Sequence, residues 1–149
     1  MSLDLAIPLR DAIMASAALT GPLGTYENEP AVFTRRPVPK AAQYPLIWIG
    51  PNAAGGDENF LNTRNPMVMR DVGVSGEVGA PGHPDDQYRT VESLAFALWD
   101  YFDDRKDRLT VPGFNVLRIS ARPPIVGPSD DERHLTRVVM LSVRLSETT

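Results

Sequence analysis

The two histidines are the first side chains to consider for chemistry. They are His83 and His134, and the second stands shortly after Asp130 and Asp131. Imidazole and carboxylate groups bind divalent metals, but the usual sites combine two or more histidines or cysteines at fixed spacings. Neither histidine has a second imidazole at such a spacing. We therefore expect a solvated acidic loop here rather than a metal site, and we expect no cofactor.

Nucleophiles and paired acids give no stronger signal. The chain has no cysteine, so disulfides and thiolate chemistry are excluded, and none of its serines stands in a G-x-S-x-G elbow. Adjacent carboxylates occur at 85–86 and 103–104. General acid–base catalysis needs acids that converge from separate elements, with pKa values that burial drives apart. Neighbouring acids at helix ends are normally surface charges, so the sequence predicts no catalytic residue.

Three evenly spaced glycines superficially suggest a nucleotide-binding loop. Gly73, Gly76 and Gly79 follow one another at intervals of three, which is not the G-x-G-x-x-G spacing, and no P-loop lysine follows them. We interpret the glycines as bulges in a strand and as the turn before a helix.

Composition limits the class of protein. With 149 residues, 42% of them hydrophobic and 23% charged, the chain has the length and core content of one domain spanning 1–149. A net charge of −4 argues against broad affinity for nucleic acid or anionic lipid. No apolar run approaches the roughly 18 residues that cross a bilayer, and no targeting segment is recognisable. We expect a soluble protein without a membrane partner.

Hydrophobic periodicity predicts two helices and four strands. The helices are expected at 4–19 and from about 84 to 107, and the strands at 46–49, 67–78, 116–121 and 135–145. The first helix has a narrow apolar stripe of Leu5, Leu9, Ile13 and Ala17, and one side of the last strand is formed by Leu135, Val139, Leu141, Val143 and Leu145. A proline-rich connector covers 20–44, and long loops cover 50–66 and 122–134. The order α-β-β-α-β-β lacks an alternating βαβ pattern. It predicts an α+β fold with a mostly antiparallel four-stranded sheet and both helices packed on one face.

The central helix carries the clearest pattern in the chain. Pro84 suits its first turn, and its apolar face is formed by Tyr88, Val91, Leu94, Ala95, Leu98, Tyr101 and Phe102. Phe96 falls about 60° outside this face at 100° per residue. An exposed aromatic on a soluble helix indicates a subunit contact, whereas cover by the chain's own loops is the alternative.

The two long loops combine apolar and charged residues. Loops of more than about 12 residues without regular structure are commonly functional or disordered. We predict that these two carry contacts to partner proteins, although a merely flexible loop is the alternative. The candidate contact residues are Phe60, Leu61 and Arg64 in the first loop, and Ile125, Val126, Asp130, Asp131 and Glu132 in the second.

Four segments taken in order resemble the phage tail-completion family that includes the lambda-type tail terminators, a part that gene-transfer-agent particles also use. These segments are the N-terminal helix ending at Ala18-Leu19-Thr20-Gly21, the proline-led strand at 44–50, the central helix, and the closing strand beginning Arg133-His134-Leu135-Thr136-Arg137-Val138-Val139. The likeness spans nearly the whole chain and consists of hydrophobic patterns.

The resemblance implies a structural virion protein. Such a terminator forms a ring, usually hexameric, that caps the tail tube protein, ends its polymerisation and joins the tail to the head-tail connector or stopper protein. It assembles in the bacterial host cytoplasm and remains in the neck region of the virion tail. DNA would pass through its lumen without specific binding, which the net charge of −4 permits.

Two other classes of function stay open on the sequence. A small α+β enzyme or ligand-binding domain would place a pocket between sheet and helices, since a fold does not fix a function. A monomeric adaptor is the third option.

Overall fold

The computed structural model describes residues 4–51, 66–79, 83, 86–128 and 132–148. Its helices are α1 (Ala6–Met14), α2 (Ala17–Thr20), α3 (Tyr88–Phe102) and the short 3-10 helix η1 (Lys106–Arg108). The longer strands are β4 (Leu46–Pro51), β5 (Met67–Glu77), β6 (Phe114–Ala121) and β8 (His134–Glu147). Four strands have two residues each: β1 (Thr25–Tyr26), β2 (Glu29–Pro30), β3 (Val32–Phe33) and β7 (Ile125–Val126).

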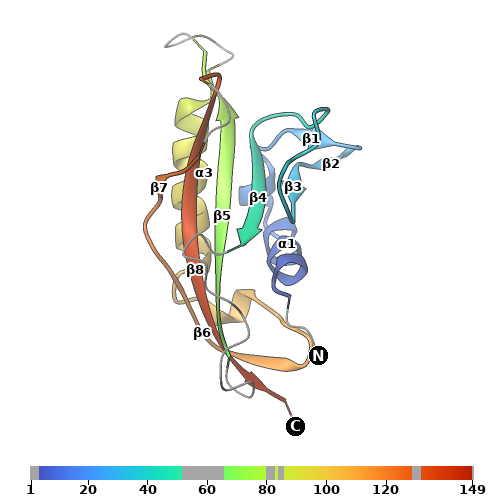
Figure 1. Ribbon diagram of the computed structural model, residues 1–149, viewed down its shortest axis with the longest axis vertical. Coiled ribbons are helices and arrows are strands. Elements are labelled where there is room, and N and C mark those ends of the chain that lie inside the picture. Colours follow the sequence, from blue (N-terminus) through green and yellow to red (C-terminus); the bar gives the residue numbers. More distant parts are fainter. Residues whose placement is uncertain (1–3, 52–65, 80–82, 84–85, 129–131, 149) are drawn as a thin grey trace.

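The main sheet has six strands in the order β3-β4-β5-β8-β6, with β7 also paired to β8. Its long strands β5 and β8 run side by side through the molecule (Figure 1). β3 is parallel to β4, and the other pairings are antiparallel. The α+β class is confirmed, but the predicted mostly antiparallel sheet of four strands is corrected: β3 and β7 bring the sheet to six strands, and the parallel pairing of β3 with β4 makes it mixed.

The two unforeseen strands come from segments predicted to be a connector and a loop. Each is too short to show an alternating pattern, and backbone hydrogen bonds to the long strands hold them in the sheet. Ile47 N–H donates to the Ala31 carbonyl at 2.9 Å beside β3, and Gly127 N–H donates to the Thr136 carbonyl at 3.0 Å beside β7. The prediction of a long unstructured tip at 122–134 is therefore corrected.

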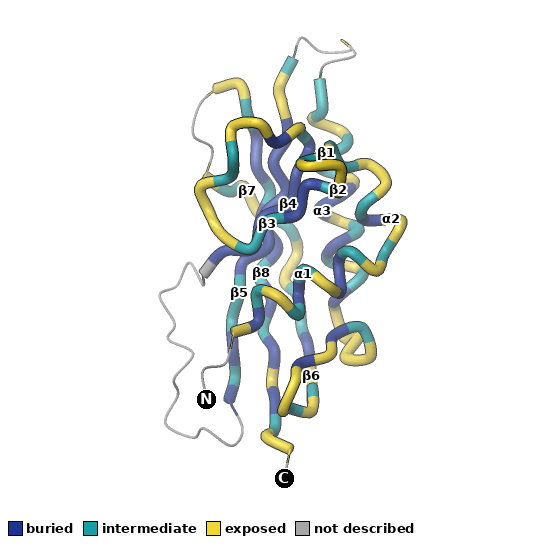
Figure 2. Tube along the Cα trace, turned by 90° about the vertical axis from the view of Figure 1, so that its right-hand side faces the viewer, coloured by how far each residue is buried: buried dark blue, intermediate teal, exposed yellow. Residues whose placement is uncertain are grey.

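Both long helices pack on one face of the sheet. α3 buries Val91, Leu94, Ala95, Leu98 and Phe102 there, as the periodicity predicts. They meet one side of β8, formed by Leu135, Val139, Leu141, Val143 and Leu145. The prediction is wrong for Tyr88: this first residue of α3 is 48% exposed. Figure 2 shows the buried stretches of the strands in the interior and the exposed ones along β6.

The N-terminal helix is two helices rather than the predicted single one. α1 ends at Met14, and Ser16 leaves the helical conformation with φ −104° and ψ 111°. Its side chain then accepts a hydrogen bond from Leu19 N–H at 3.3 Å and caps α2. The break turns the chain: Leu5, Leu9 and Ile13 of the predicted stripe are fully buried, whereas the prediction is wrong for Ala17, which is exposed at the start of α2.

The central helix begins later than predicted, at Tyr88 instead of Pro84. Gln87 N–H donates to the Glu77 carbonyl and the Gln87 side chain accepts from Glu77 N–H, both at 2.9 Å. The Gln87 N–H is therefore taken by the end of β5 and cannot extend the helix toward Pro84, while the Gln87 carbonyl accepts the first helical hydrogen bond from Val91 N–H at 2.9 Å. The helix also ends earlier, at Phe102, and η1 follows.

The opposite face of the sheet is built around Trp48. Its indole N–H donates to Ser75 Oγ at 3.1 Å, and Ser75 Oγ lies 2.7 Å from Thr136 Oγ1. Gly73 stands under the indole, where an added Cβ would overlap the ring. The interpretation of Gly73 and Gly76 as bulges is wrong, because β5 pairs with β8 without a register shift; they are sites of close packing instead.

Candidate docking surfaces

Strand β7 presents two large apolar side chains to solvent. Ile125 is 51% and Val126 is 76% exposed, although both belong to the sheet through pairing with Val138 and Arg137. Pro123 and Pro124 precede them. The sequence predicted these two apolar residues as contacts, and the structure places them on an exposed sheet edge rather than in an unstructured loop.

Phe96 lies on the same side of the molecule as β7. On α3 it stands between Glu92, which accepts a hydrogen bond from Arg137 Nε at 2.7 Å, and Trp99, whose indole donates to the Ala121 carbonyl at 3.2 Å. Arg137 lies in β8 opposite Val126 of β7, and Ala121 ends β6, which pairs with the same edge of β8 as β7 does. Phe96 is 51% exposed and its ring centroid lies 6.0 Å from that of Trp99. Because neighbouring residues of a strand point to opposite faces of the sheet, Ile125 lies on the Trp48 face with its partner Val138, and Val126 lies on the α3 face with its partner Arg137. We call Phe96, Ile125 and Val126, which border β7 on both faces of the sheet, the β7 edge.

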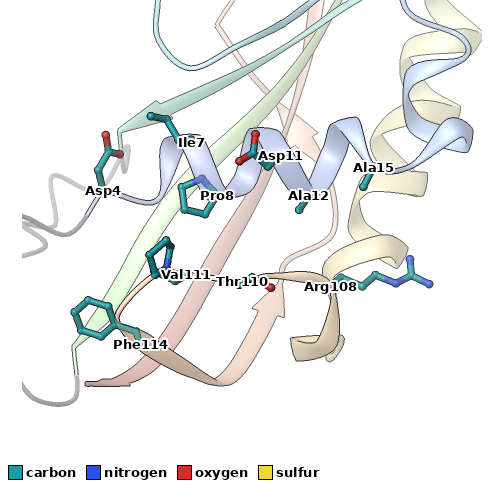
Figure 3. A pocket seen from close by; sticks show the side chains of 11 residues that line it. Asp4, Ile7, Pro8, Asp11, Ala12, Ala15, Arg108, Thr110, Val111 and Phe114 are labelled. Atoms are coloured by element: carbon teal, nitrogen blue, oxygen red, sulfur yellow. The ribbon is translucent and has the colours of Figure 1, made fainter. Parts of the chain in front are cut away.

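A groove of about 720 Å³ lies between α1 and the segment at 108–114, which leads into β6. We call it the α1 groove. Figure 3 shows Pro8, Ala12 and Ala15 on the side of α1 that faces Val111. Phe114 and Pro112 also line the groove, and Ile7 on its border is 61% exposed. Its lining is mainly apolar.

The rim of the α1 groove is acidic on its helical side. Asp4 and Asp11 both border it, and Figure 3 shows their carboxylates on the side of α1 away from Val111. Asp4 also accepts a hydrogen bond from Ala6 N–H at 2.8 Å and lies 3.8 Å from Arg70. Arg108, the cation in the lining, has its guanidinium 4.2 Å from the centre of the Tyr101 ring. The charge on the exposed rim is thus negative.

Sequence reasoning missed the α1 groove, although one signal for it was present. Ile7 lies 200° from Leu5 at 100° per residue, so it falls opposite the buried stripe of the helix. An apolar residue in that position is an exposed one, as with Phe96. The residues across the groove from α1 come about a hundred positions later in the chain. The periodicity of a single helix cannot predict a contact over that separation.

The remaining predicted contact residues are placed only in part. Glu132 is exposed in the turn before β8. Phe60, Leu61, Arg64, Asp130 and Asp131 lie outside the described residues. These positions therefore stay predictions.

One of the two histidines packs against an aromatic ring. His134 stacks on Tyr44 with ring centroids 4.4 Å apart, next to a cavity of about 30 Å³ that Ser75 and Thr136 also line. A space of that size accommodates about one water molecule and no substrate. Within the parts of the chain that the structure describes, no three histidine, cysteine or acidic residues gather as metal ligands.

Across the described helices, none is both long and apolar enough to cross a membrane.

The likeness to known proteins lies in the fold. No protein-family model matches the chain, and no curated protein matches it. A chain of the virion of a native gene transfer agent particle superposes with a TM-score of 0.67 at 15% identity, over 95% of this chain and 94% of that one. A second solved structure, of a protein known by a sequence identifier alone, gives a TM-score of 0.53 at 17% identity over 97% and 95% of the two chains. The chain therefore shares its whole fold with a component of a gene transfer agent virion.

Proposed function

We propose that this chain is a structural virion protein, a tail terminator of a phage or gene-transfer particle. The observation that carries the proposal is the full-length fold match to a chain of a gene transfer agent virion. It agrees with the independent resemblance of four sequence segments to the tail-completion family. In this role the protein forms a ring, caps the tail tube, ends its polymerisation and joins the tail to the head connector or stopper.

The exposed apolar surfaces support an assembly role. Monomeric proteins rarely leave contiguous apolar patches in solvent unless the patches bind something. The β7 edge carries three exposed apolar side chains, and the α1 groove is a separate hollow with a mainly apolar lining. A contact between unlike surfaces closes into a ring when the rotation between subunits permits it. Such a ring needs interfaces and no catalytic group, and we propose that the chain is not an enzyme.

The two long loops complete the proposed role. We assign the contacts with the tail tube and the connector to 51–66, through Phe60, Leu61 and Arg64, and to 122–134, through its acidic end at 130–132. DNA passes through the lumen without specific binding. The protein acts in the neck of the virion after assembly in the host cytoplasm.

Deletion of the gene in a producing strain tests this function. Without a terminator, tube polymerisation has no stop, so electron micrographs should show tails of variable, excessive length and heads without tails. A plasmid copy of the gene should restore tails of uniform length. Uniform, head-attached tails in the deletion strain would reject the terminator role.

A ligand-binding domain is the second candidate, and the α1 groove is the observation that favours it. Its volume of about 720 Å³ lies in the range of small-molecule sites, roughly 300–1,000 Å³. Such sites also hold several polar groups that converge on the ligand, whereas the lining here is mainly apolar. A thermal-shift screen of metabolites checks this candidate, and a hit that Ala12→Trp abolishes would support it.

A further inference from the structure

We propose that the β7 edge of one copy of this chain docks into the α1 groove of a second copy. The inference rests on the proposed function, because it names the surfaces that join neighbouring subunits of the ring.

The two surfaces match in polarity and form. The β7 edge carries apolar side chains on both faces of its strand: Val126, which is 76% exposed, lies on the α3 face as Phe96 does, and Ile125 lies on the Trp48 face. The α1 groove is a hollow lined by small and apolar groups, among them Ala12, Ala15 and Val111. Small residues on α1 leave the space that larger aliphatic and aromatic groups fill. Docking of this edge into the hollow removes apolar area from water, and Val126 as the most exposed of the three loses the largest fraction, which favours association.

The charges beside the two surfaces are complementary. Arg122 is exposed directly before Pro123 and β7. Asp4 and Asp11 stand on the rim of the α1 groove. A cation next to the docking strand and anions next to the receiving groove favour this pairing and oppose the pairing of two grooves. A second copy of the chain is therefore a better occupant than an acidic partner.

The two surfaces occupy different sides of the subunit. Figure 1 shows β7 at the left of the sheet and α1 at the right. α1 packs beside β3 and β4, whereas β7 pairs with β8 on the other side of β5. Each copy thus offers one docking edge and one groove to two different neighbours. This is the arrangement that a closed ring of head-to-tail contacts requires.

Prolines disfavour the simpler contact in which β7 would pair with a strand of a second copy. Pro123, Pro124 and Pro128 surround β7 and have no backbone N–H to donate. A second strand added there would find few donors, so the exposed edge resists strand addition. The exposed side chains of β7 are left as its means of binding.

The absence of cysteine from the chain permits a direct test. Particles are produced with the chain carrying both Thr110→Cys in the α1 groove and Val126→Cys on the β7 edge, and a short thiol-specific cross-linker is added. We expect a ladder of covalent multimers that stops at the subunit number of the ring. Either cysteine alone should give monomers, because the contact joins unlike surfaces.

A control and a replacement pair keep the test decisive. Thr110→Cys combined with Val78→Cys, another exposed apolar position at 42%, should give no ladder. If the first pair is not incorporated into particles, Pro112→Cys with Ile125→Cys replaces it. Particles that contain a double-cysteine chain but give only monomers overturn the inference. Particles that lack the wild-type chain altogether overturn the proposed function instead.

Charge reversal gives an independent measurement. Asp11→Arg and Arg122→Asp should each reduce cross-linking of the Thr110→Cys/Val126→Cys chain several-fold, because each places like charges together. The two reversals combined should restore it. Equal loss in the combined variant would show that these side chains do not face each other.

Discussion

The two faces of the sheet are packed by different means. The face under α1 and α3 is filled by aliphatic side chains, such as Leu98 and Val139, that are fully buried and make no side-chain hydrogen bonds. The opposite face of the sheet depends on the indole of Trp48, which lies over Gly73 and donates a hydrogen bond to Ser75. The first arrangement needs only apolar residues at the right period. The second needs particular residues at particular positions.

This difference determines what a substitution does on each face. A change on the helical face leaves a cavity, whose cost follows the volume removed. A change on the Trp48 face either forces atoms together or leaves polar groups without partners, and its cost depends on whether the neighbours can move. The following substitutions separate these effects.

The largest expected effect is on the helical face. Leu98→Ala removes a fully buried side chain from the centre of α3 and should lower the free energy of unfolding by about 2–5 kcal/mol. Urea denaturation followed by far-ultraviolet circular dichroism measures the change. A loss below about 1 kcal/mol would mean that this face tolerates cavities and that the comparison fails.

A smaller loss is expected from overpacking on the other face. In Gly73→Ala the new Cβ overlaps the Trp48 ring, which is only 6% exposed, so the free energy of unfolding should fall by about 1–3 kcal/mol. Combining it with Trp48→Leu relieves the overlap, so the double variant should lose less than the sum of the two single losses. Additive losses would show that the ring is not the obstacle.

Hydrogen bonding on the Trp48 face is tested by the next substitution. Ser75→Ala leaves both the Trp48 indole N–H and the Thr136 hydroxyl without this partner and should cost about 1–3 kcal/mol. Thr136→Val keeps the bond from the indole and should cost less. The same urea titration compares the two, and a greater loss in Thr136→Val would contradict the assignment.

The smallest effect on folding is expected outside both faces. Phe96 is 51% exposed, so Phe96→Ala should change the free energy of unfolding by no more than about 0.5 kcal/mol. Association should weaken, because the β7 edge loses an aromatic group. Thermal melts and sedimentation of the same samples separate the two readouts. A destabilised fold with unchanged association would reverse our assignment of this residue.

The fold was predictable wherever packing repeats along one element. The period of α3 identified Leu94 and Leu98 as core, and alternation identified the buried side of β8. The two-residue strands β3 and β7 were not predictable, since bonds from other segments create them. The break in the first helix depends on the cap that Ser16 provides. From sequence alone, several other serines could equally be predicted to cap a helix.

Of the two docking surfaces, only the residues of the β7 edge were predictable from the sequence. Phe96, Ile125 and Val126 could be recognised as exposed apolar residues, but their gathering on one edge depends on how α3 lies against β6 and β8. The α1 groove exists between segments far apart in the chain, so the sequence offered only Ile7 as a hint. Concave surfaces of this kind depend on tertiary packing.

The position of β8 in the sheet has a consequence for how the chain is made. β8 pairs with β5 on one side and with β6 and β7 on the other, yet its residues are synthesised after all of theirs. While the chain emerges from the ribosome, β6 and β7 have no strand of the described sheet to pair with, and the main sheet can form only its β3–β4 and β4–β5 pairings. Contacts of such long sequence separation make folding slow and cooperative. We therefore expect nascent chains that stop before 134 to expose apolar strands and to depend on chaperones.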